Sequence, residues 1–588
     1  MRTKIKERLS LLRNNMRKNE IDAYIIPTSD PHLSEYIPSH WKVREWLSGF
    51  TGSAGTLVVT LNEAWLWTDS RYYLQASDQL IGTDIQLFKD GLKTTPSIPE
   101  HLTATLFQGD TVAFDGEMIS INTFLRWSKQ LPGITLKSKS ILDAVWVNRP
   151  PLPSTPCYIY SEVYAGKSSK DKIKEIRASH IKKGHSLLIT ALDEIAWILN
   201  IRGDEIQNNP VVISYLFITP DTCTLCVDSQ KITEELSQYL KEQGVTTQGY
   251  HSIYSLIKTT NASTIQYDPK TTNVKISQVI PTSVQQITAP SPIALMKAIR
   301  NATEIKNMKH AMIKDGVVMV RFLKWLDQNK SNEITEIDVS DKLYELRAQQ
   351  DLFKGESFDT IAGYKEHGAI VHYSATSDSN ATIKPSGYLL VDSGAQYLDG
   401  TTDLTRTIAL GELSKDEKID YTLVLKGHIA LARAIFPEGT RGSQVDILAR
   451  LPLWENKKNF LHGTGHGVGQ FLCVHEGPQS IRMNENSVTL QLGMLTSNEP
   501  GVYIDGSHGI RTESLILVVP FGEGLFGDYY QFETVTLCPI CTKGIIKNIL
   551  TNEEINWLNT YHQKVYHTLS PFLNNEEQEW LQKATVKI

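Results

Sequence analysis

The chain has few of the features that mark secreted or membrane proteins. It contains six cysteines in 588 residues, too few for a disulfide framework. It also lacks an uninterrupted apolar run of the roughly 18 residues that a membrane-spanning helix needs. The best stretch, LLITALDEIAWILNI, is broken by Asp193 and Glu194. We therefore expect neither a disulfide-stapled scaffold nor a membrane partner.

Clustered positive charge is absent as well. No dense run of lysine and arginine occurs, and the formal net charge is −6, which argues against nucleic acid as a partner. The first residues, MRTKIKERLSLLRNNMRKNE, lack the apolar centre of a signal peptide. Their apolar residues follow helical spacing instead: Ile5, Leu9, Leu12 and Met16. We expect this segment to be the first helix of a cytoplasmic protein.

Two CxxC pairs are present, Cys223–Cys226 and Cys538–Cys541. Four thiolates could hold a structural zinc ion. However, TCTLCVD has the pattern of a strand, on which an odd spacing directs two side chains to opposite faces. Pro539 interrupts the second pair, but nothing else supports a metal there. We therefore expect no zinc at these cysteines.

The first half of the chain contains a faint internal repeat. Residues 55–71, GTLVVTLNEAWLWTDSR, align without gaps to residues 214–230, SYLFITPDTCTLCVDSQ, and each has the pattern of two strands around a turn. Residues 16–37 and 181–200 both resemble a helix end, an apolar strand and a second helix. This order, used twice, predicts two similar α/β domains among the three that the length suggests. The alternative is a composition shared by chance.

The last part of the chain alternates long helices with pairs of strands. A helix is predicted over about residues 301–326. YLLVDSG and TTDLTRTIAL are predicted as strands flanking a loop, and MLTSNEPGVYI and IRTESLILVV as a second pair. Antiparallel pairing would bring Asp392 and Asp403 to one site, because the loop returns the chain. Glu499 and Glu513 could converge in the same way.

Five side chains of metal-ligand type stand in these segments: Asp392, Asp403, His466, Glu499 and Glu513. Four carboxylates and one neutral imidazole carry a formal charge of −4, which balances two divalent cations. Oxygen-rich ligation with one imidazole suits manganese, zinc or cobalt better than copper or an iron–sulfur cluster. A paired-metal site lowers the pKa of bound water and clamps a carbonyl under attack. Taken singly, each residue could equally be an ordinary turn or surface residue.

The ordered motifs resemble the pita-bread metallopeptidase family, which includes methionine aminopeptidase, prolidase, creatinase and Xaa-Pro aminopeptidase. They are VHYSAT, VDSGAQYLDGTTDLTRT, FLHGTGHGVGQFLCVHEGP, SNEPGVY and GIRTES. GFTGSAGTLVV, TDSRYYLQA and ALDEIAWILNIRG resemble the N-terminal domains of three-domain Xaa-Pro aminopeptidases. The resemblance implies creatinase-type α/β domains at residues 1–164 and 165–302. It implies a pita-bread catalytic domain at 303–588, with a C-terminal tail from about residue 530.

The resemblance also implies a role for each ligand. Asp392 would be a terminal ligand of one metal ion, Asp403 and Glu513 would bridge both ions, and His466 and Glu499 would hold the second ion. A metal-bridging hydroxide would attack the scissile carbonyl, and Glu499 would relay a proton.

Further residues match the family's substrate site. By resemblance, His475 would steady the tetrahedral intermediate, and His372 would contact substrate beyond the scissile bond. His462, Tyr503 and Arg511 would line a proline pocket or brace the ligands. Each has a simpler alternative; Tyr503, for example, could be an ordinary aromatic strand residue.

The resemblance implies the activity of a metal-dependent aminopeptidase. It also implies a homodimer and a cofactor of two divalent ions, with manganese first among the candidates named above. It would release the first residue from peptides with proline second. Prolidase, which cuts Xaa-Pro dipeptides, is disfavoured by the extra N-terminal repeat, and creatinase by the presence of all five ligands. An inert interaction scaffold would not need to keep the five ligands, so their presence argues against that alternative as well. Asn498 replaces the aspartate that the family often has, which affects only the charge around the site.

Overall fold

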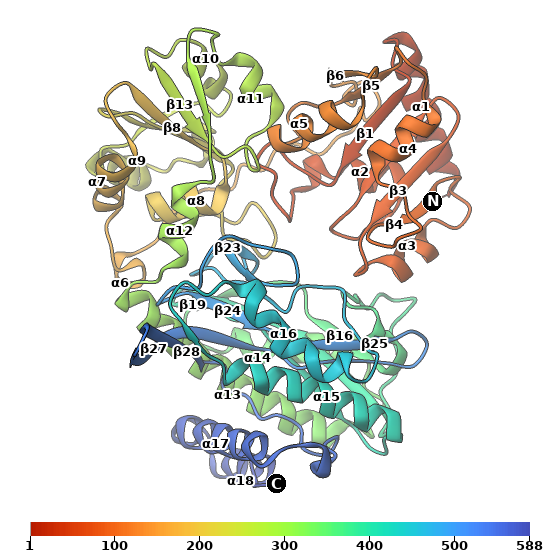
Figure 1. Ribbon diagram of the computed structural model, residues 1–588, viewed down its shortest axis with the longest axis vertical. Helices are drawn as coiled ribbons and strands as arrows, with labels where there is room; N and C mark the ends of the chain where they lie inside the picture. Colours follow the sequence, from red (N-terminus) through yellow and green to blue (C-terminus); the bar gives the residue numbers. More distant parts are fainter. Residues whose placement is uncertain (1) are drawn as a thin grey trace. The chain divides into compact units, whose positions relative to one another are not determined.

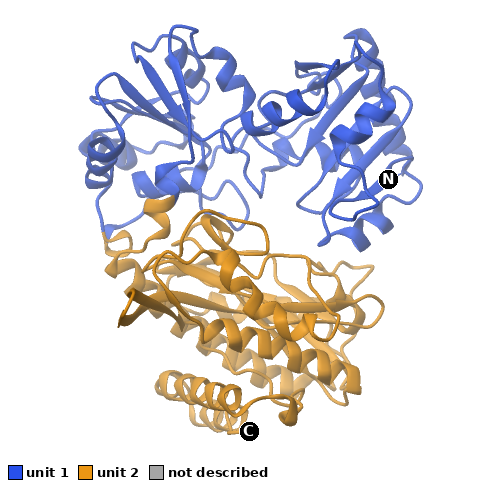
Figure 2. Ribbon diagram, in the orientation of Figure 1, with its two compact units in different colours: residues 1–162, 167–294 blue, residues 163–166, 295–588 orange. Residues whose placement is uncertain are grey.

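The computed structural model describes residues 2–588. The chain forms two compact units: Met1–Glu162 with Lys167–Ala294, and Val163–Gly166 with Leu295–Ile588 (Figure 2). Both units combine helices with sheets, which confirms the predicted α/β class. The finer division at residues 164/165 and 302/303 stays a prediction. Among the helices within residues 2–588, none combines the length and apolarity that crossing a membrane requires.

The N-terminal unit contains two six-stranded sheets with the same topology. Their strand orders are β4-β3-β2-β1-β5-β6 and β12-β11-β10-β8-β13-β14. The first comprises β1 (Ala23–Pro27), β2 (Thr56–Thr60), β3 (Ala64–Thr68), β4 (Gln86–Lys89), β5 (Thr111–Phe114) and β6 (Thr135–Ser138). The second comprises β8 (His185–Ile189), β10 (Ser214–Ile218), β11 (Cys223–Val227), β12 (Thr246–Gln248), β13 (Thr264–Tyr267) and β14 (Gln285–Thr288). The matching order confirms the internal repeat, and the aligned segments form the hairpins β2–β3 and β10–β11.

Helices pack around these sheets (Figure 1). They are α1 (Arg2–Lys18), α2 (Val43–Ser48), α3 (Tyr73–Gln79), α4 (Ile98–Thr105), α5 (Ile121–Gln130), α7 (Ser169–His180), α8 (Leu192–Leu199), α9 (Glu234–Glu242), α10 (Ser252–Lys258) and α11 (Val274–Val279). On α1 the predicted apolar face is the buried one: Ile5, Leu9, Leu12 and Met16. The 3.6-residue period therefore identified this helix correctly.

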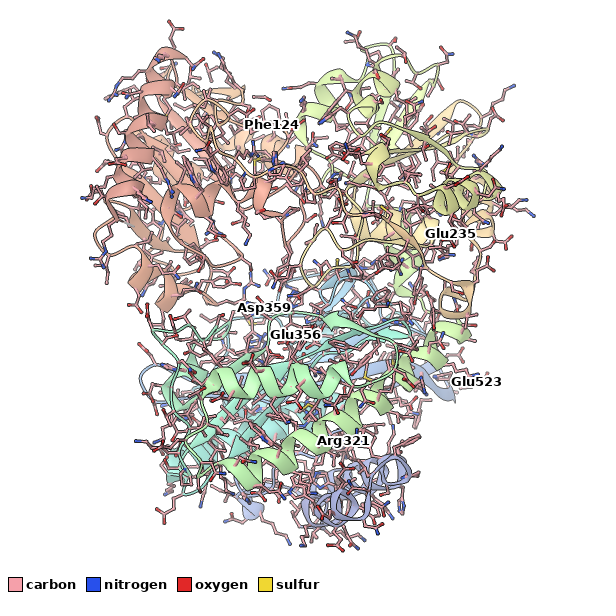
Figure 3. The ribbon with its side chains drawn as sticks, turned by 180° about the vertical axis from the view of Figure 1, so that it is seen from behind. Phe124, Glu235, Arg321, Glu356, Asp359 and Glu523 are labelled. Carbon is pink, nitrogen blue, oxygen red and sulfur yellow. The ribbon has the colours of Figure 1, made fainter. Side chains whose placement is uncertain are left out.

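Long helices dominate the C-terminal unit (Figure 1). They are α13 (Ala302–Asn329), α14 (Glu336–Ala348), α15 (Lys415–Ala432), α16 (Gly442–Trp454), α17 (Asn552–Leu569) and α18 (Asn575–Ala584). The predicted helix at 301–326 is α13, which begins in a capping box formed by Asn301 and Glu304. Arg321 projects from α13 in the view from behind (Figure 3). Its guanidinium pairs with Glu577 of α18 at 3.1 Å. The core of this unit includes Val320, Leu425 and Val565, which come from α13, α15 and α17.

Three sheets of this unit position the functional residues. The three-stranded sheet has the order β16-β17-β20, the six-stranded sheet β21-β28-β27-β24-β22-β23, and the third is the pair β25–β26. Their bounds are β16 (Ile361–Tyr364), β17 (Tyr388–Ser393), β20 (Leu404–Ala409), β21 (Ile435–Pro437), β22 (Gly465–Gly467), β23 (Glu476–Ile481), β24 (Leu495–Asn498), β25 (Gly501–Ile504), β26 (His508–Arg511), β27 (Ser514–Gly524) and β28 (Gly527–Thr534). A further small sheet joins β15 (Phe353–Glu356), β18 (Ala395–Tyr397) and β19 (Gly400–Thr401).

The second predicted strand pair needs a correction. Residues 494–504 and 510–519 were expected to form one strand each, but each region divides into two strands. β24 pairs with β27 in the six-stranded sheet, whereas β25 pairs with β26 separately. Pro500 explains the first break, because proline has no N–H to donate to the strand ladder. Glu499 and Glu513 stand at the two breaks, where the chain passes between sheets.

Candidate active site

Asp392 and Asp403 come from adjacent antiparallel strands. The register of β17 with β20 places Asp392 opposite Thr405. Asp403 precedes Thr405 by two residues, a spacing that directs side chains of an extended chain to the same face. Burial and then the charge of Asp392 raise the pKa of Asp403, so the two carboxylates act on each other. Antiparallel pairing of the two strands around their connecting loop therefore brings Asp392 and Asp403 together, as expected from the sequence.

Arg511 orients the carboxylate of Asp392. Its guanidinium donates a hydrogen bond to Asp392 Oδ2 at 2.6 Å. The other oxygen, Oδ1, is buried and has no hydrogen-bond donor among residues 2–588. A buried acceptor without a partner is costly, and a cation would satisfy it. Asp392 is therefore held with one oxygen free for a metal ion.

Glu513 reaches the same place from the junction between β26 and β27. Its backbone N–H donates to the Thr405 carbonyl at 3.1 Å, and the Thr405 hydroxyl donates to Glu513 Oε2 at 2.7 Å. The same hydroxyl accepts from Arg511 Nε at 3.1 Å. Thr405 therefore fixes both Glu513 and Arg511. Sequence reasoning did not select it, although its position two residues after Asp403 was a usable signal.

His466 on β22 presents one ring nitrogen to the carboxylates. Its Nδ1 lies 2.9 Å from the Gly467 carbonyl, so we assign the proton to Nδ1 and a lone pair to Nε2. Nε2 lies 3.4 Å from Glu499 Oε1 and 3.6 Å from Asp403 Oδ2. An imidazole lone pair and two carboxylate oxygens cannot hydrogen-bond one another. Their arrangement suits a cation between them.

Ligand atoms of Asp403, His466 and Glu513 all lie within 4.8 Å of one another. Burial, and then the charges of Asp392 and Glu499, raise the pKa of Asp403 well above its usual value. Burial and the charges of Asp403 and Asp392 do the same to Glu513, and burial raises the pKa of Glu499 to about 7. The buried carboxylates therefore require neutralisation by protons or cations. This donor set of oxygens with one imidazole fits a divalent ion.

Chelator-stripped protein should lose stability as the pH rises from about 5 to 8. The folded carboxyl groups keep protons that the unfolded chain releases above about pH 4.3, so the free energy of unfolding falls across the window between the two pKa values. Glu499→Gln removes one of these groups and should raise the pH 8 stability of the stripped protein by up to about 3 kcal/mol. Calorimetry of stripped wild type and variant at pH 4 and pH 8 measures this. Equal melting temperatures at pH 8 would contradict it.

His462, Tyr503 and Arg511 form a hydrogen-bonded chain beside the carboxylates. Arg511 Nη1 donates to the Tyr503 hydroxyl at 2.7 Å. That oxygen lies 2.8 Å from His462 Nε2, and His462 Nδ1 lies 2.7 Å from the Gly463 carbonyl. The Nδ1 contact assigns its proton, so the Tyr503 hydroxyl donates to Nε2. The three side chains, predicted as neighbours of the ligands, are thus joined into one fixed surface.

The remaining predicted residues lie at two places in the C-terminal unit. The ring of His475 meets that of His466 edge-on at a centroid distance of 4.4 Å. His372 is half-buried in the turn that follows the 3-10 helix Lys365–Ala369, which itself follows β16. Glu336, fully buried on α14, anchors this turn because it accepts hydrogen bonds from the Tyr373 hydroxyl at 2.9 Å and from His367 Nδ1 at 2.8 Å. Sequence reasoning missed Glu336, which is distant in sequence and lies outside the motifs.

Asn498 is the one noted departure from the family pattern, and its surroundings explain the amide. The residue is fully buried on β24. Its Nδ2 donates to the His428 carbonyl at 2.9 Å, and His428 Nδ1 lies 3.1 Å from the Asn498 carbonyl. An ionised aspartate could not donate the first of these bonds. The amide therefore links β24 to α15 at the residue before Glu499.

Comparison with known protein families covers nearly the whole chain. Residues 306–520 match metallopeptidase family M24, and residues 528–588 match the C-terminal region of the same peptidases. Residues 8–145 and 148–304 each match the creatinase/prolidase N-terminal domain. The two matches to one domain type agree with the two sheets of identical topology.

Individual relatives are similar over their full length. Aminopeptidase P1 of Arabidopsis thaliana is 39% identical, over 98% of this chain and 99% of its own. A probable Xaa-Pro aminopeptidase P of Coprinopsis cinerea is 39% identical, over 99% and 98%. The crystal structure of X-prolyl aminopeptidase from Caenorhabditis elegans, described as a cytosolic enzyme with a di-nuclear active site, superposes with a TM-score of 0.94 at 32% identity, over 99% of this chain and 100% of its own. The chain therefore belongs to metallopeptidase family M24, with two creatinase/prolidase-type N-terminal domains.

Proposed function

We propose that this protein is a metal-dependent Xaa-Pro aminopeptidase, which releases the N-terminal residue from peptides with proline in the second position. The observation that carries the proposal is the buried set of ligand-type side chains around Asp403, His466 and Glu513. Its support is the full-length similarity to aminopeptidases P. An inert scaffold would have no reason to keep mutually repelling buried carboxylates.

The proposed cofactor is a pair of divalent cations, manganese foremost, with zinc and cobalt as alternatives. When bound, such a pair lowers the pKa of water and polarises the scissile carbonyl. Asp403 and Glu513 would hold both ions, Asp392 the first, and His466 and Glu499 the second. The free Oδ1 of Asp392 and the Nε2 lone pair of His466 support this assignment.

The chain's own residues supply positioning and proton transfer. Glu499 Oε1 accepts a hydrogen bond from the Ser497 hydroxyl at 3.3 Å, and we assign Glu499 the transfer of a proton from the attacking water to the leaving proline nitrogen. His475 is assigned to donate to the carbonyl oxygen as negative charge develops there. His372 is assigned to the peptide beyond proline, on the turn that Glu336 anchors.

The preference for proline has a physical basis in the hydrogen-bonded chain of His462, Tyr503 and Arg511. Proline lacks a backbone N–H and has a fixed φ, so a site built for extended peptides loses both a hydrogen bond and shape fit at proline. Side chains locked by hydrogen bonds can instead form a rigid wall against a rigid ring. Arg511 also holds Asp392, so this wall has a fixed position relative to the carboxylates.

A peptide panel under manganese tests the proposal. We expect Xaa-Pro-Yaa to be cut between Xaa and Pro about 10- to 200-fold faster than Xaa-Ala-Yaa, the range that fit in one pocket can give. An N-acetylated Xaa-Pro-Yaa should not be cut, and a tripeptide should outperform the Xaa-Pro dipeptide. Mass spectrometry of the products gives the bond and the rates. Faster dipeptide turnover would indicate a prolidase, and no turnover with any divalent metal would indicate a scaffold.

We further propose that the protein is a homodimer located in the cytoplasm. Its partners would be peptides, and neither nucleic acid nor a membrane. The likeness to the C. elegans cytosolic enzyme supports the location. Light scattering at micromolar concentration decides between a dimer and a single 66.1 kDa species.

A further inference from the structure

A cavity lies on the face of β20 opposite the carboxylates. Side chains alternate along this strand: Thr405 donates to Glu513 on one face, and the next residue, Arg406, lines the cavity on the other. The cavity has a volume of about 230 Å³. Its other walls come from α13, from residues 539–543 and from α18. None of the site residues described above lines it.

The walls of this cavity are largely apolar. They include Leu323, Leu326, Ile408, Leu410, Ile540 and Trp580. Ligand sites in proteins combine such walls with a few polar groups that fix orientation. A compact, strongly hydrated anion would lose its water against these side chains, whereas an aliphatic chain would gain by burial. The occupant should therefore be mainly apolar.

Arg406 gives the cavity a positive charge that has no matching carboxylate. Arg406 is 2% exposed, and all the groups that accept hydrogen bonds from its guanidinium are neutral. They are the carbonyls of Pro539, Cys538, Glu513 and Thr405 and the hydroxyls of Tyr561 and Ser514. Among residues 2–588 it forms no ion pair within 4.0 Å. Burial and then the charge of Arg406 lower the pKa of His428 to about 3 and that of His562 to about 4.

Charges at the cavity margin are also mostly positive. Lys330, Lys543 and Lys583 line it, with Asp327 as the one acidic lining residue. Asp327 pairs with Lys330 Nζ at 2.6 Å and with Lys543 Nζ at 3.9 Å. A single carboxylate shared between two lysines leaves an excess of positive charge. Lys583 adds to that excess, as does Arg406.

We propose that this cavity binds an aliphatic monocarboxylate of about six to eight carbons. The volume of about 230 Å³ is far above the roughly 10–15 Å³ that a single water molecule needs by the same measure, so the cavity has room for a short aliphatic chain. The carboxylate neutralises the excess lysine charge, and the chain fills the space between α13 and α18. Arg406 lines the cavity and also donates to the carbonyl of Glu513, a candidate metal ligand between β26 and β27. A single side chain therefore connects the cavity to the metal-ligand candidates.

Calorimetric titration of the full-length metal-loaded protein with octanoate tests the proposal. We expect a dissociation constant of about 0.1–1 mM, as for a ligand of about ten non-hydrogen atoms with ordinary efficiency. Octan-1-ol, which lacks the charge, and butyrate, which lacks the chain, should each bind at least about tenfold more weakly. Octanol binding as tightly as octanoate would overturn the requirement for an anion.

Two variants separate this cavity from the carboxylate site. Lys543→Glu reverses an exposed margin charge and should weaken octanoate binding at least about tenfold. Lys547→Glu changes another exposed lysine, which lies outside the cavity, and should leave octanoate binding within about twofold. Ala584→Trp, at the end of α18, should fill the cavity and abolish binding, with circular dichroism confirming the fold. Octanoate binding that survives both Lys543→Glu and Ala584→Trp, or no heat up to about 10 mM ligand, would overturn the proposal.

Discussion

Replacing Asp403 by alanine should remove most of the bound metal and lower turnover of Xaa-Pro-Yaa by at least about 1,000-fold. Asp403 is 3% exposed and lies among ligand atoms of His466 and Glu513. A carboxylate shared by two cations offsets their mutual repulsion, so its loss acts on both ions at once. Hydrolytic enzymes depend on such sites for accelerations above about 10⁶-fold, which leaves room for a loss of this size. Elemental analysis and steady-state kinetics measure the two effects.

Two further variants make the Asp403 result specific. Asp403→Asn keeps the size of the side chain but removes its charge, and it should lose metal nearly as completely as the alanine variant. Asp505→Ala alters an exposed aspartate in the turn between β25 and β26, and it should keep both metal and turnover. Two metal ions per chain and near-normal turnover in Asp403→Ala would refute the bridging role.

Replacing His475 by alanine should leave the metal content unchanged and lower kcat by about 10²–10³-fold. This is the loss expected when one donor to a developing negative charge is removed. The edge-on contact with His466 at 4.4 Å places His475 next to a ligand, so metal content must be measured together with kcat. An effect confined to KM would make His475 a substrate-binding residue instead.

His180→Ala provides the control for His475→Ala, because His180 is an exposed histidine at the end of α7 in the N-terminal unit. It should change neither kcat nor KM. A drop in kcat that follows a loss of metal in His475→Ala would mean that the residue supports His466 rather than the reaction. Restoring turnover with excess manganese would identify that case.

Local patterns predicted much of the fold. The apolar spacing of Ile5, Leu9, Leu12 and Met16 identified α1, and the same criterion found α13. The gap-free alignment of two strand–turn–strand segments identified two domains that prove to share one sheet topology. These features depend on residues near one another in sequence, and periodicity reports such contacts directly.

The breaks between strands and the residues that hold the site in place by hydrogen bonds were harder to predict. The strand predicted over residues 494–504 ran across the change of sheet at Pro500, although a proline inside a strand pattern is itself a signal for a break. Thr405 lies within a motif but is not of metal-ligand type, and Glu336 lies outside the motifs, yet each fixes a part of the site through hydrogen bonds to residues about 30 to 110 positions away. Such partners become visible only when the chain is folded, since nothing in the local sequence specifies which distant donor will face a buried carboxylate.

The sequence by itself determined the type of chemistry: four carboxylates and one histidine in ordered motifs specify a divalent-metal hydrolase family, because ligand type and charge are properties of the residues. The tertiary structure decided how those residues work together. Within residues 2–588, it left Asp392 Oδ1 without a hydrogen-bond donor and buried Arg406 without a paired carboxylate. It also turned the Nε2 of His466 toward Asp403 and Glu499. Burial and orientation follow from packing between distant strands, and these contacts set the charge balance that no linear spacing contains.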